Sequence, residues 1–200
     1  MSDGMRRREF LGLGCTAGGF LLGAGVAAAA PSQPSGVTFP WPYRELDVRK
    51  VQERAYRSYG QAGCMFGVFE AIAGSVADLL GKPYTEFPFA LSAYGGGGVA
   101  SWGTLCGTCN GAAMAIGLFH QGRVRTTLTS EVFAWYEASS LPTFEPDAPA
   151  RVSREFKMPA SRADSVLCHV SISRWSGSSH FASYSPERLE RCGRLVADVA

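Results

Sequence analysis

Cysteine and glycine are the residue types that most constrain how this 200-residue chain can fold. The sequence holds six cysteines and 24 glycines, and five of the cysteines lie beyond residue 60. Sulfur ligands select iron–sulfur clusters, zinc or copper(I) over hard cations. Glycine-rich backbone next to such ligands can supply N–H donors to the sulfur atoms. We therefore expect a small domain whose cysteines have a chemical role as well as a packing role.

Composition and charge exclude two classes of protein. Hydrophobic residues make up 46% of the chain and charged residues 18%, which is too apolar for a disordered chain. The formal net charge is +2, and the only dense basic run lies within the first ten residues. A nucleic-acid-binding protein needs a basic surface on its folded part. We therefore expect no nucleic-acid partner.

Residues 1–30 are expected to be an export signal. The segment Arg7-Arg8-Glu9-Phe10-Leu11 is similar to a twin-arginine signal, and an apolar stretch rich in glycine and alanine follows it up to Ala30. That route resembles an exporter for folded proteins, which favours a cofactor over disulfides as the role of the cysteines. We expect cleavage after Ala28 or Ala29 and a periplasmic product. If the signal stays uncleaved, its length is just enough to anchor the chain in a membrane.

The rest of the chain is expected to form one domain. Residues 31–44 form a Pro-rich linker, and residues 45–200 form a helical, cysteine-rich redox domain. Apolar residues at helical spacing predict helices over about 48–59, 65–80, 104–120, 127–138 and 186–199. Ser185 and Pro186 are typical of a helix start. Residues 141–158 are predicted to be a long loop, and residues 166–175 a helix or a short strand.

The predicted fold class is therefore all-α: a compact bundle of about five helices with Gly/Pro-rich loops. Four large aromatic residues are expected in its core, namely Phe87, Phe89, Trp102 and Trp175.

The positions of the cysteines on these helices permit several chemistries. Cys64 opens the second helix, Cys106 and Cys109 lie one turn apart on the third, and Cys192 faces inward on the last; Cys168 follows the long loop. Thiolates near helix N-termini have a lowered pKa, which suits metal ligation. The Cys106-x-x-Cys109 pair also fits a thiol–disulfide oxidoreductase. Two further alternatives are buried cysteines that only pack, and disulfides that leave one spare thiol.

Four segments in order carry a resemblance to a known family. They are Gly63-Cys64-Met65, Cys106-Gly107-Thr108-Cys109-Asn110-Gly111, Ser165-Val166-Leu167-Cys168, and Arg191-Cys192 with the residues that follow. The chain resembles the redox-active family named for its C_GCAxxG_C_C pattern, with Thr108 in place of the family alanine. The resemblance covers about residues 59–200, and Cys109 is additional to the family pattern.

The resemblance implies an iron–sulfur cluster held by Cys64, Cys106, Cys168 and Cys192, with Cys109 as a helper or replacement ligand. The implied role is electron transfer with a redox partner protein in the periplasm, and a homodimer is left open. The exported branch of the family is similar to split-Soret cytochrome c, which also carries haems. These 200 residues contain no Cys-x-x-Cys-His motif, so we expect no covalent c-type haem.

The remaining candidate residues do not single out a reaction. His120, His169 and His180 are expected to be structural or solvated, although His169 directly follows Cys168. No Ser-His-Asp spacing, phosphate-binding loop or paired carboxylate stands out, so catalytic residues remain unassigned and enzyme activity stays open. The alternatives to an electron-transfer protein are a dithiol oxidoreductase using Cys106 and Cys109, and a disulfide-bonded subunit without redox activity.

Overall fold

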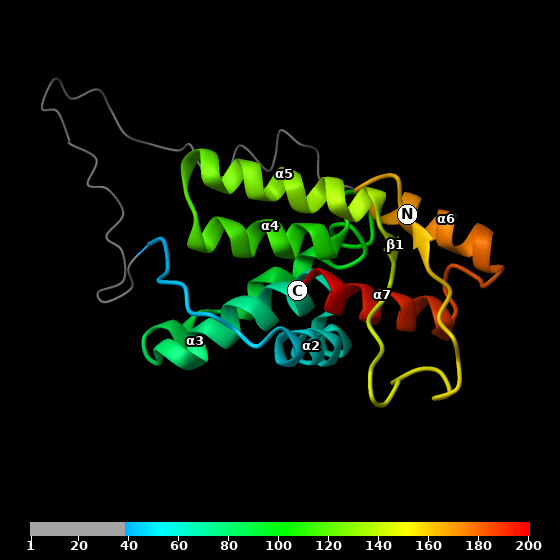
Figure 1. The fold of residues 1–200 in the computed structure, drawn as a ribbon, viewed down its shortest axis with the longest axis horizontal. Helices are drawn as coiled ribbons and strands as arrows, with labels where there is room; N and C mark the ends of the chain where they lie inside the picture. Colours follow the sequence, from blue (N-terminus) through cyan, green and yellow to red (C-terminus); the bar gives the residue numbers. More distant parts are fainter. Residues whose placement is uncertain (1–38) are drawn as a thin grey trace, which may run out of the picture. The chain divides into compact units, whose positions relative to one another are not determined.

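The computed structural model describes residues 39–200, all within the unit Pro34–Ala200. The predicted export signal and most of the predicted linker lie outside these described residues. The described part contains six α-helices: α2 (Val48–Phe69), α3 (Ser75–Leu80), α4 (Gly107–Phe119), α5 (Gly122–Ala138), α6 (Cys168–Ser179) and α7 (Pro186–Val199). Helices dominate the fold, which confirms the all-α prediction (Figure 1).

Shorter elements complete the fold. A π-helical turn η1 (Glu70–Gly74) joins α2 to α3, and two 3-10 helices follow, η2 (Tyr84–Glu86) and η3 (Phe89–Gly95). Strands β1 (Ser140–Leu141) and β2 (Ser161–Arg162) pair antiparallel at the base of the long loop. The sequence did not predict this sheet, because two residues per strand are too short to show an alternating pattern.

The stretch Val48–Leu80 runs through the centre of the domain. The predicted break between its two helices lies at Ala62 and Gly63, where Gly63 adopts φ +85°, a conformation that favours glycine. The helix continues through Tyr59 and Gly60, where an earlier loosening was predicted. By length and apolarity this stretch could cross a membrane, but 61% of its most apolar window is buried inside the protein. It therefore serves as the core helix of the domain.

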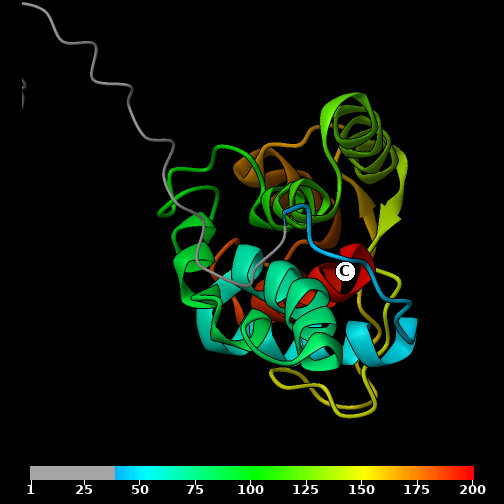
Figure 2. The ribbon, with the colours of Figure 1, turned by 90° about the vertical axis from the view of Figure 1, so that its left-hand side faces the viewer.

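Helix α7 begins as predicted but is buried more completely than predicted. The Ser185 hydroxyl accepts a hydrogen bond from the Arg188 N–H at 3.2 Å, and Pro186 occupies the first turn. One apolar face was expected to point inward, yet every residue from 190 to 197 is buried. The reason is that α2 packs along α7 on one side (Figures 1 and 2), while α4, the Tyr136 ring and the loop after β1 contact it elsewhere, and one hydrogen bond joins it to α6.

Helices α4 and α5 lie side by side as a hairpin (Figure 2). The predicted helix over 104–120 begins at Gly107, so Cys106 is its N-cap residue. Helix α5 begins at Gly122, five residues before the predicted start. The segment 166–175, left open between helix and strand, contributes to α6. Cys106 and Cys168 thereby lie at or next to the starts of two helices.

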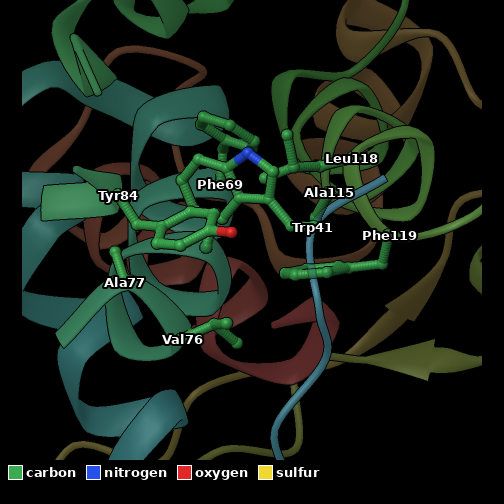
Figure 3. Packing of buried hydrophobic residues seen from close by; sticks show 9 residues of the cluster. Trp41, Phe69, Val76, Ala77, Tyr84, Ala115, Leu118 and Phe119 are labelled. Atoms are coloured by element: carbon green, nitrogen blue, oxygen red, sulfur yellow. The ribbon is translucent and has the colours of Figure 1, made fainter. Parts of the chain in front are cut away.

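One cluster of core residues includes Trp41, which belongs to the predicted linker. Trp41 is only 4% exposed, and its ring lies edge-on to the Tyr84 ring at a centroid distance of 4.9 Å (Figure 3). A second edge contact, to Phe87, has a centroid distance of 5.6 Å. Its backbone N–H also donates to the Leu118 carbonyl at 2.9 Å. Burial of such a large ring stabilises the fold by about 1.5–3 kcal/mol. The structured domain therefore includes residues assigned to the linker.

Of the four aromatic residues expected in the core, three are buried or partly buried and one is exposed. Trp175 is fully buried, and its indole N–H donates to the Pro159 carbonyl at 2.7 Å. Phe87 and Phe89 are partly buried against the cluster around Trp41. Trp102 is 81% exposed, so the prediction for this residue was wrong. It lies in a loop in which Val99, Ala100 and Ser101 have left-handed backbone conformations, and this loop turns the indole outward.

Candidate metal centre

The five cysteines beyond residue 60 are all buried free thiols. Cys64 directly follows the kink in α2, Cys106 caps α4, Cys109 lies in the first turn of α4, Cys168 opens α6, and Cys192 lies in α7. None is more than 9% exposed, and none forms a disulfide. Cysteines from four separate helices thus meet in the interior, although more than 120 residues separate the first from the last.

Cys106 is the centre of one group of thiols. Hydrogen bonds from the Cys109 and Cys168 thiols hold the pKa of Cys106 well below its usual range, despite its burial. The Thr108 hydroxyl also lies 2.8 Å from the Cys106 sulfur. The same hydrogen bonds, together with burial, raise the pKa values of Cys109 and Cys168. Within this group, Cys106 is therefore the thiol that loses its proton most readily.

Cys64 and Cys192 form a second group next to the first. Both belong to an apolar cluster with Val68, Ala112 and Val196. Burial raises the pKa of Cys64, and the nearby charges of Cys192 and Cys106 raise it further. The charges of Cys64 and Cys192 also raise the pKa of Cys168. A charge in one group therefore shifts the pKa of a thiol in the other group.

Backbone pairing positions Cys106 and Cys168 together. An isolated antiparallel bridge joins Leu105 to Leu167. The Cys106 N–H donates to the Val166 carbonyl and the Cys168 N–H to the Thr104 carbonyl, both at 2.8 Å. These bonds fix the residue before each helix, which sets the direction of both thiols. Sequence reasoning missed this bridge because its partners lie 62 residues apart and each contributes a single residue.

Close backbone approach around the thiols depends on glycine. A Cβ on Gly107 would lie 2.8 Å from the Cys64 Cβ, and a Cβ on Gly98 would lie 2.8 Å from the Cys168 Cβ. Gly98 also has φ +73°, which disfavours any other residue. The glycines were expected to supply N–H donors to sulfur, and these contacts show that they also allow close packing around the thiols. The Gly97 N–H also donates to the Cys64 sulfur.

Three residues that the sequence analysis did not select complete the site. Arg191 is 1% exposed and donates to the Ser171 hydroxyl at 2.8 Å, and the Tyr136 hydroxyl donates to the same oxygen at 3.0 Å. Burial would lower the pKa of Arg191, but the charges of Cys192, Tyr136 and Cys106 outweigh burial and raise it. No local signal marked this role, because charged residues occur along the whole of α7, on both sides of Arg191.

Two features of the arrangement bear on what the thiols could hold. Among residues 39–200, no group of three or more His, Cys, Asp or Glu side chains is close enough to hold a single metal ion. A cluster of several irons and sulfides is wider than one ion, and its thiolate ligands can lie farther apart. The buried Arg191 Nε has no hydrogen-bond partner among the described residues, and Arg191 forms no ion pair with a carboxylate there. A cofactor with negative charge and sulfur acceptors would satisfy this group.

The histidines lie at or near helix ends. His120 and His180 follow the C-terminal ends of α4 and α6. His169 is exposed and follows Cys168 in the first turn of α6. The four predicted ligands Cys64, Cys106, Cys168 and Cys192 are thus brought into one region together with Cys109, and their ligand roles remain a prediction.

Comparison with known proteins gives three related findings. Residues 66–200 match the family model described as "Putative redox-active protein (C_GCAxxG_C_C)". The chain is 40% identical over 209 residues to split-Soret cytochrome c of Desulfovibrio desulfuricans, covering 98% of this chain and 74% of that protein. The solved structure of a split-Soret cytochrome c of this species, described as containing a novel iron centre, superposes with a TM-score of 0.75. The superposition covers 80% of this chain and 67% of the other, at 40% identity.

The matched segment contains four of the five buried cysteines and Arg191, and it begins two residues after Cys64. The matched range lies within the extent of the resemblance drawn from the sequence, about residues 59–200. The likeness extends through the fold, since the chain and the solved cytochrome are similar in both sequence and structure. This chain belongs to the C_GCAxxG_C_C family of redox-active proteins and is related to split-Soret cytochrome c.

Proposed function

We propose that this protein is an exported electron-transfer protein that holds an iron–sulfur cluster between the two thiol groups. Cys64, Cys106, Cys168 and Cys192 are the proposed ligands, and Cys109 is a neighbouring thiol that replaces a ligand or hydrogen-bonds to one. A bound cluster would supply one-electron redox chemistry. The relative with a described iron centre supports a metal cofactor, and the choice of an iron–sulfur cluster is part of the proposal.

The burial of the Arg191 guanidinium is the observation that best supports the proposal. A guanidinium at 1% exposure is costly unless a negative partner compensates it. The groups that offset the burial of Arg191 are Cys192, Tyr136 and Cys106. Hydrogen bonds from Cys109 and Cys168 hold the pKa of Cys106 well below its usual range. A cluster ligated by several thiolates carries a net negative charge and meets this requirement more fully.

The rest of the chain has a supporting role in this proposal. The five thiols are shielded from water, which limits their oxidation and keeps the local dielectric low. Backbone N–H groups such as that of Gly97 can donate to sulfur and so tune a cluster potential. The twin-arginine signal belongs to the proposal as well, because it would carry the loaded, folded protein to the periplasm. A redox protein there would be the partner.

Anaerobic purification of the full chain tests the proposal. We expect brown protein with iron and acid-labile sulfide, and a visible spectrum that bleaches on reduction. Colourless protein without iron, purified from cells that load other iron–sulfur proteins, would contradict it. A strong Soret band that survives acid-acetone extraction would instead show covalent haem, which we propose is absent.

A dithiol oxidoreductase is the second candidate, and one observation favours it. Cys106 has a lowered pKa and a hydrogen-bonded neighbour, Cys109, which are the properties of an attacking and a resolving thiol. Access argues against it, because Cys109 is fully buried and Cys106 is 4% exposed. Reduction of insulin disulfides by iron-free protein, abolished by either Cys106→Ser or Cys109→Ser, would establish this second function.

A further inference from the structure

A pocket of about 410 Å³ opens on the surface next to the thiol groups. It lies between the loop that carries Gly97 and Ser101, the first turns of α6, and the segment that leads into α7. Its polar lining comes from the side chains of Ser101, His169, Ser173, Ser183 and Arg188. Ile172 is the one large apolar side chain in the lining. The volume lies within the range that accommodates small organic ligands.

The chemistry of the lining favours an anion. Arg188 supplies a full positive charge, three serine hydroxyls and an imidazole supply hydrogen bonds, and no carboxylate lines the pocket. Arg188 is anchored because its Nε donates to the Ser183 carbonyl at 2.6 Å. Within residues 39–200 its two terminal nitrogens form neither a hydrogen bond nor an ion pair. A guanidinium held at one nitrogen with two free ones is suited to carboxylate or phosphate oxygens.

The pocket wall has a constrained backbone. Val99, Ala100 and Ser101 have φ values of +56°, +48° and +67°, which residues other than glycine seldom adopt. The loop is closed by backbone hydrogen bonds such as Ser101 N–H to the Gly96 carbonyl at 3.0 Å. His169 packs against Gly103, where any Cβ would overlap its ring. Strained backbone of this kind persists where surrounding contacts enforce it, and it is enriched at functional sites.

A single layer of backbone separates the pocket from the thiols. Gly97 lines the pocket, and its N–H donates to the Cys64 sulfur. His169 lines the pocket and directly follows Cys168. Burial and the charges of Cys192 and Cys64 raise the pKa of the Tyr59 phenol, and the positive charge of Arg188 partly opposes this rise. A ligand in the pocket would therefore lie close to the redox centre without touching it.

We propose that this pocket binds a small organic anion through a carboxylate or phosphate group, with Arg188 as the main contact and His169 and the serine hydroxyls as supporting donors. The site goes beyond electron transfer, because it recognises a molecule in addition to a redox partner protein. Binding requires the pocket alone, so it is testable whether or not the cysteines hold a cluster.

The test uses the purified full chain and two probes, inorganic phosphate and succinate, at constant ionic strength. Constant ionic strength keeps general screening of surface charges equal in all titrations. Calorimetry gives the dissociation constant, and the ring C2–H signal of His169 reports the place of binding. The chain has three histidines, so His169→Gln identifies this signal by its loss. We expect saturable binding of at least one probe, and the probe that binds more tightly distinguishes phosphate from carboxylate.

Variants locate the site. Arg188→Gln should weaken binding at least tenfold, and Arg188→Lys should weaken it less, because the charge remains while the planar fork is lost. Arg123→Gln is the matched control, since Arg123 is an exposed arginine on α5, away from the pocket. It should change binding less than twofold. Ser173→Asp places a negative charge in the pocket without altering Arg188, and it should abolish binding.

Two results would overturn the proposal. One is the lack of saturable binding of both probes by folded wild-type protein. The other is binding that Ser173→Asp leaves unchanged, which would place the anion elsewhere on the surface even if Arg188→Gln does not fold.

Discussion

Arg191 and Ser171 join α7 to α6 through a buried hydrogen bond of 2.8 Å from the guanidinium to the hydroxyl. The Tyr136 hydroxyl on α5 donates to the same oxygen at 3.0 Å, so three helices meet at this point. Cys192 directly follows Arg191, and the charges of Cys192 and Cys106 raise the pKa of the guanidinium. This contact therefore links the positions of three helices to the charge of the candidate centre.

Loss of the Arg191 charge should lower the reduction potential of the centre. A buried cation stabilises the more negative, reduced form, and a charged hydrogen bond contributes about 1.5–3 kcal/mol. For one electron this corresponds to a decrease of about 60–130 mV in Arg191→Met. Arg191→Lys should show a smaller decrease, and Arg162→Met, at an exposed arginine, should show none. Redox titration of the visible absorption measures these shifts, and an unchanged potential in Arg191→Met would refute the charge role.

Single serine substitutions should separate the ligands from Cys109. Cys64→Ser, Cys106→Ser, Cys168→Ser and Cys192→Ser should each lose iron, bleach the visible spectrum and lower the melting temperature, because cofactor binding stabilises the native state. Cys109→Ser should keep most of its iron, since a hydroxyl can still donate to the Cys106 sulfur as the thiol does. Iron and sulfide analysis of the five variants decides this. Equal loss in Cys109→Ser and Cys106→Ser would make Cys109 a ligand.

The close contact between Gly98 and Cys168 makes Gly98→Ala informative. The new Cβ would lie 2.8 Å from the Cys168 Cβ at a left-handed backbone position, so it should displace Cys168 and lower the iron content by more than half. Gly177→Ala is the matched control, because this exposed α6 glycine has no atom within 4 Å of the added Cβ. It should keep its iron and gain about 0.5–1 kcal/mol in stability. Full iron loading in folded Gly98→Ala would show that this contact does not set the site.

Tyr56 connects α2, α7 and the loop after β1, and its removal should destabilise the fold. Its hydroxyl donates to the Glu190 carboxylate at 2.7 Å and accepts from the Ala150 N–H at 2.7 Å. Glu190 is fully buried and also pairs with Arg194 at 3.0 Å. Tyr56→Phe should therefore lower the free energy of unfolding by about 1–3 kcal/mol. Urea denaturation at pH 7 measures the loss, and a change below 0.5 kcal/mol would contradict it.

The same residue predicts a dependence on alkaline pH. Burial, followed by the hydrogen bond to Glu190, raises the pKa of Tyr56 to about 12. The unfolded chain loses this proton near pH 10, so the stabilising contribution is present below pH 10 and falls as the pH rises to 12. Tyr56→Phe lacks this contribution. The difference in stability between wild type and Tyr56→Phe should therefore shrink between pH 10 and 12, and a constant difference would contradict the shift.

Export should depend on the arginine pair at the start of the chain. Arg7→Lys with Arg8→Lys should leave folded, cofactor-loaded precursor in the cytoplasm, because the pair is recognised by the exporter and lies outside the described fold. Cell fractionation followed by immunoblotting measures the distribution. Full recovery of the double variant in the periplasm would rule out the twin-arginine route.

The sequence by itself determined the helical class, most helix ends and the family, and it singled out the thiols that are proposed as ligands. Helical spacing of apolar residues located α7, and Ser185-Pro186 marked its start, because caps act within four residues of the chain. Proline and glycine likewise marked the end of α3 at Gly81. The ordered cysteine segments indicated the family. Each of these signals is local, so no knowledge of the folded chain is needed to read it.

Tertiary structure alone decided how the thiols divide into two groups and which residues surround them. The bridge between Leu105 and Leu167 aligns Cys106 with Cys168, and the burial of Arg191 follows from the covering of α7 on both sides. The outward turn of Trp102 depends on a strained loop that its own backbone hydrogen bonds close and that Thr104 joins to α6. Hydrophobic pattern predicts that a side chain prefers burial, but neighbours from elsewhere in the chain determine whether space is available. The pairing of distant segments, which no local pattern encodes, therefore sets the geometry of the site.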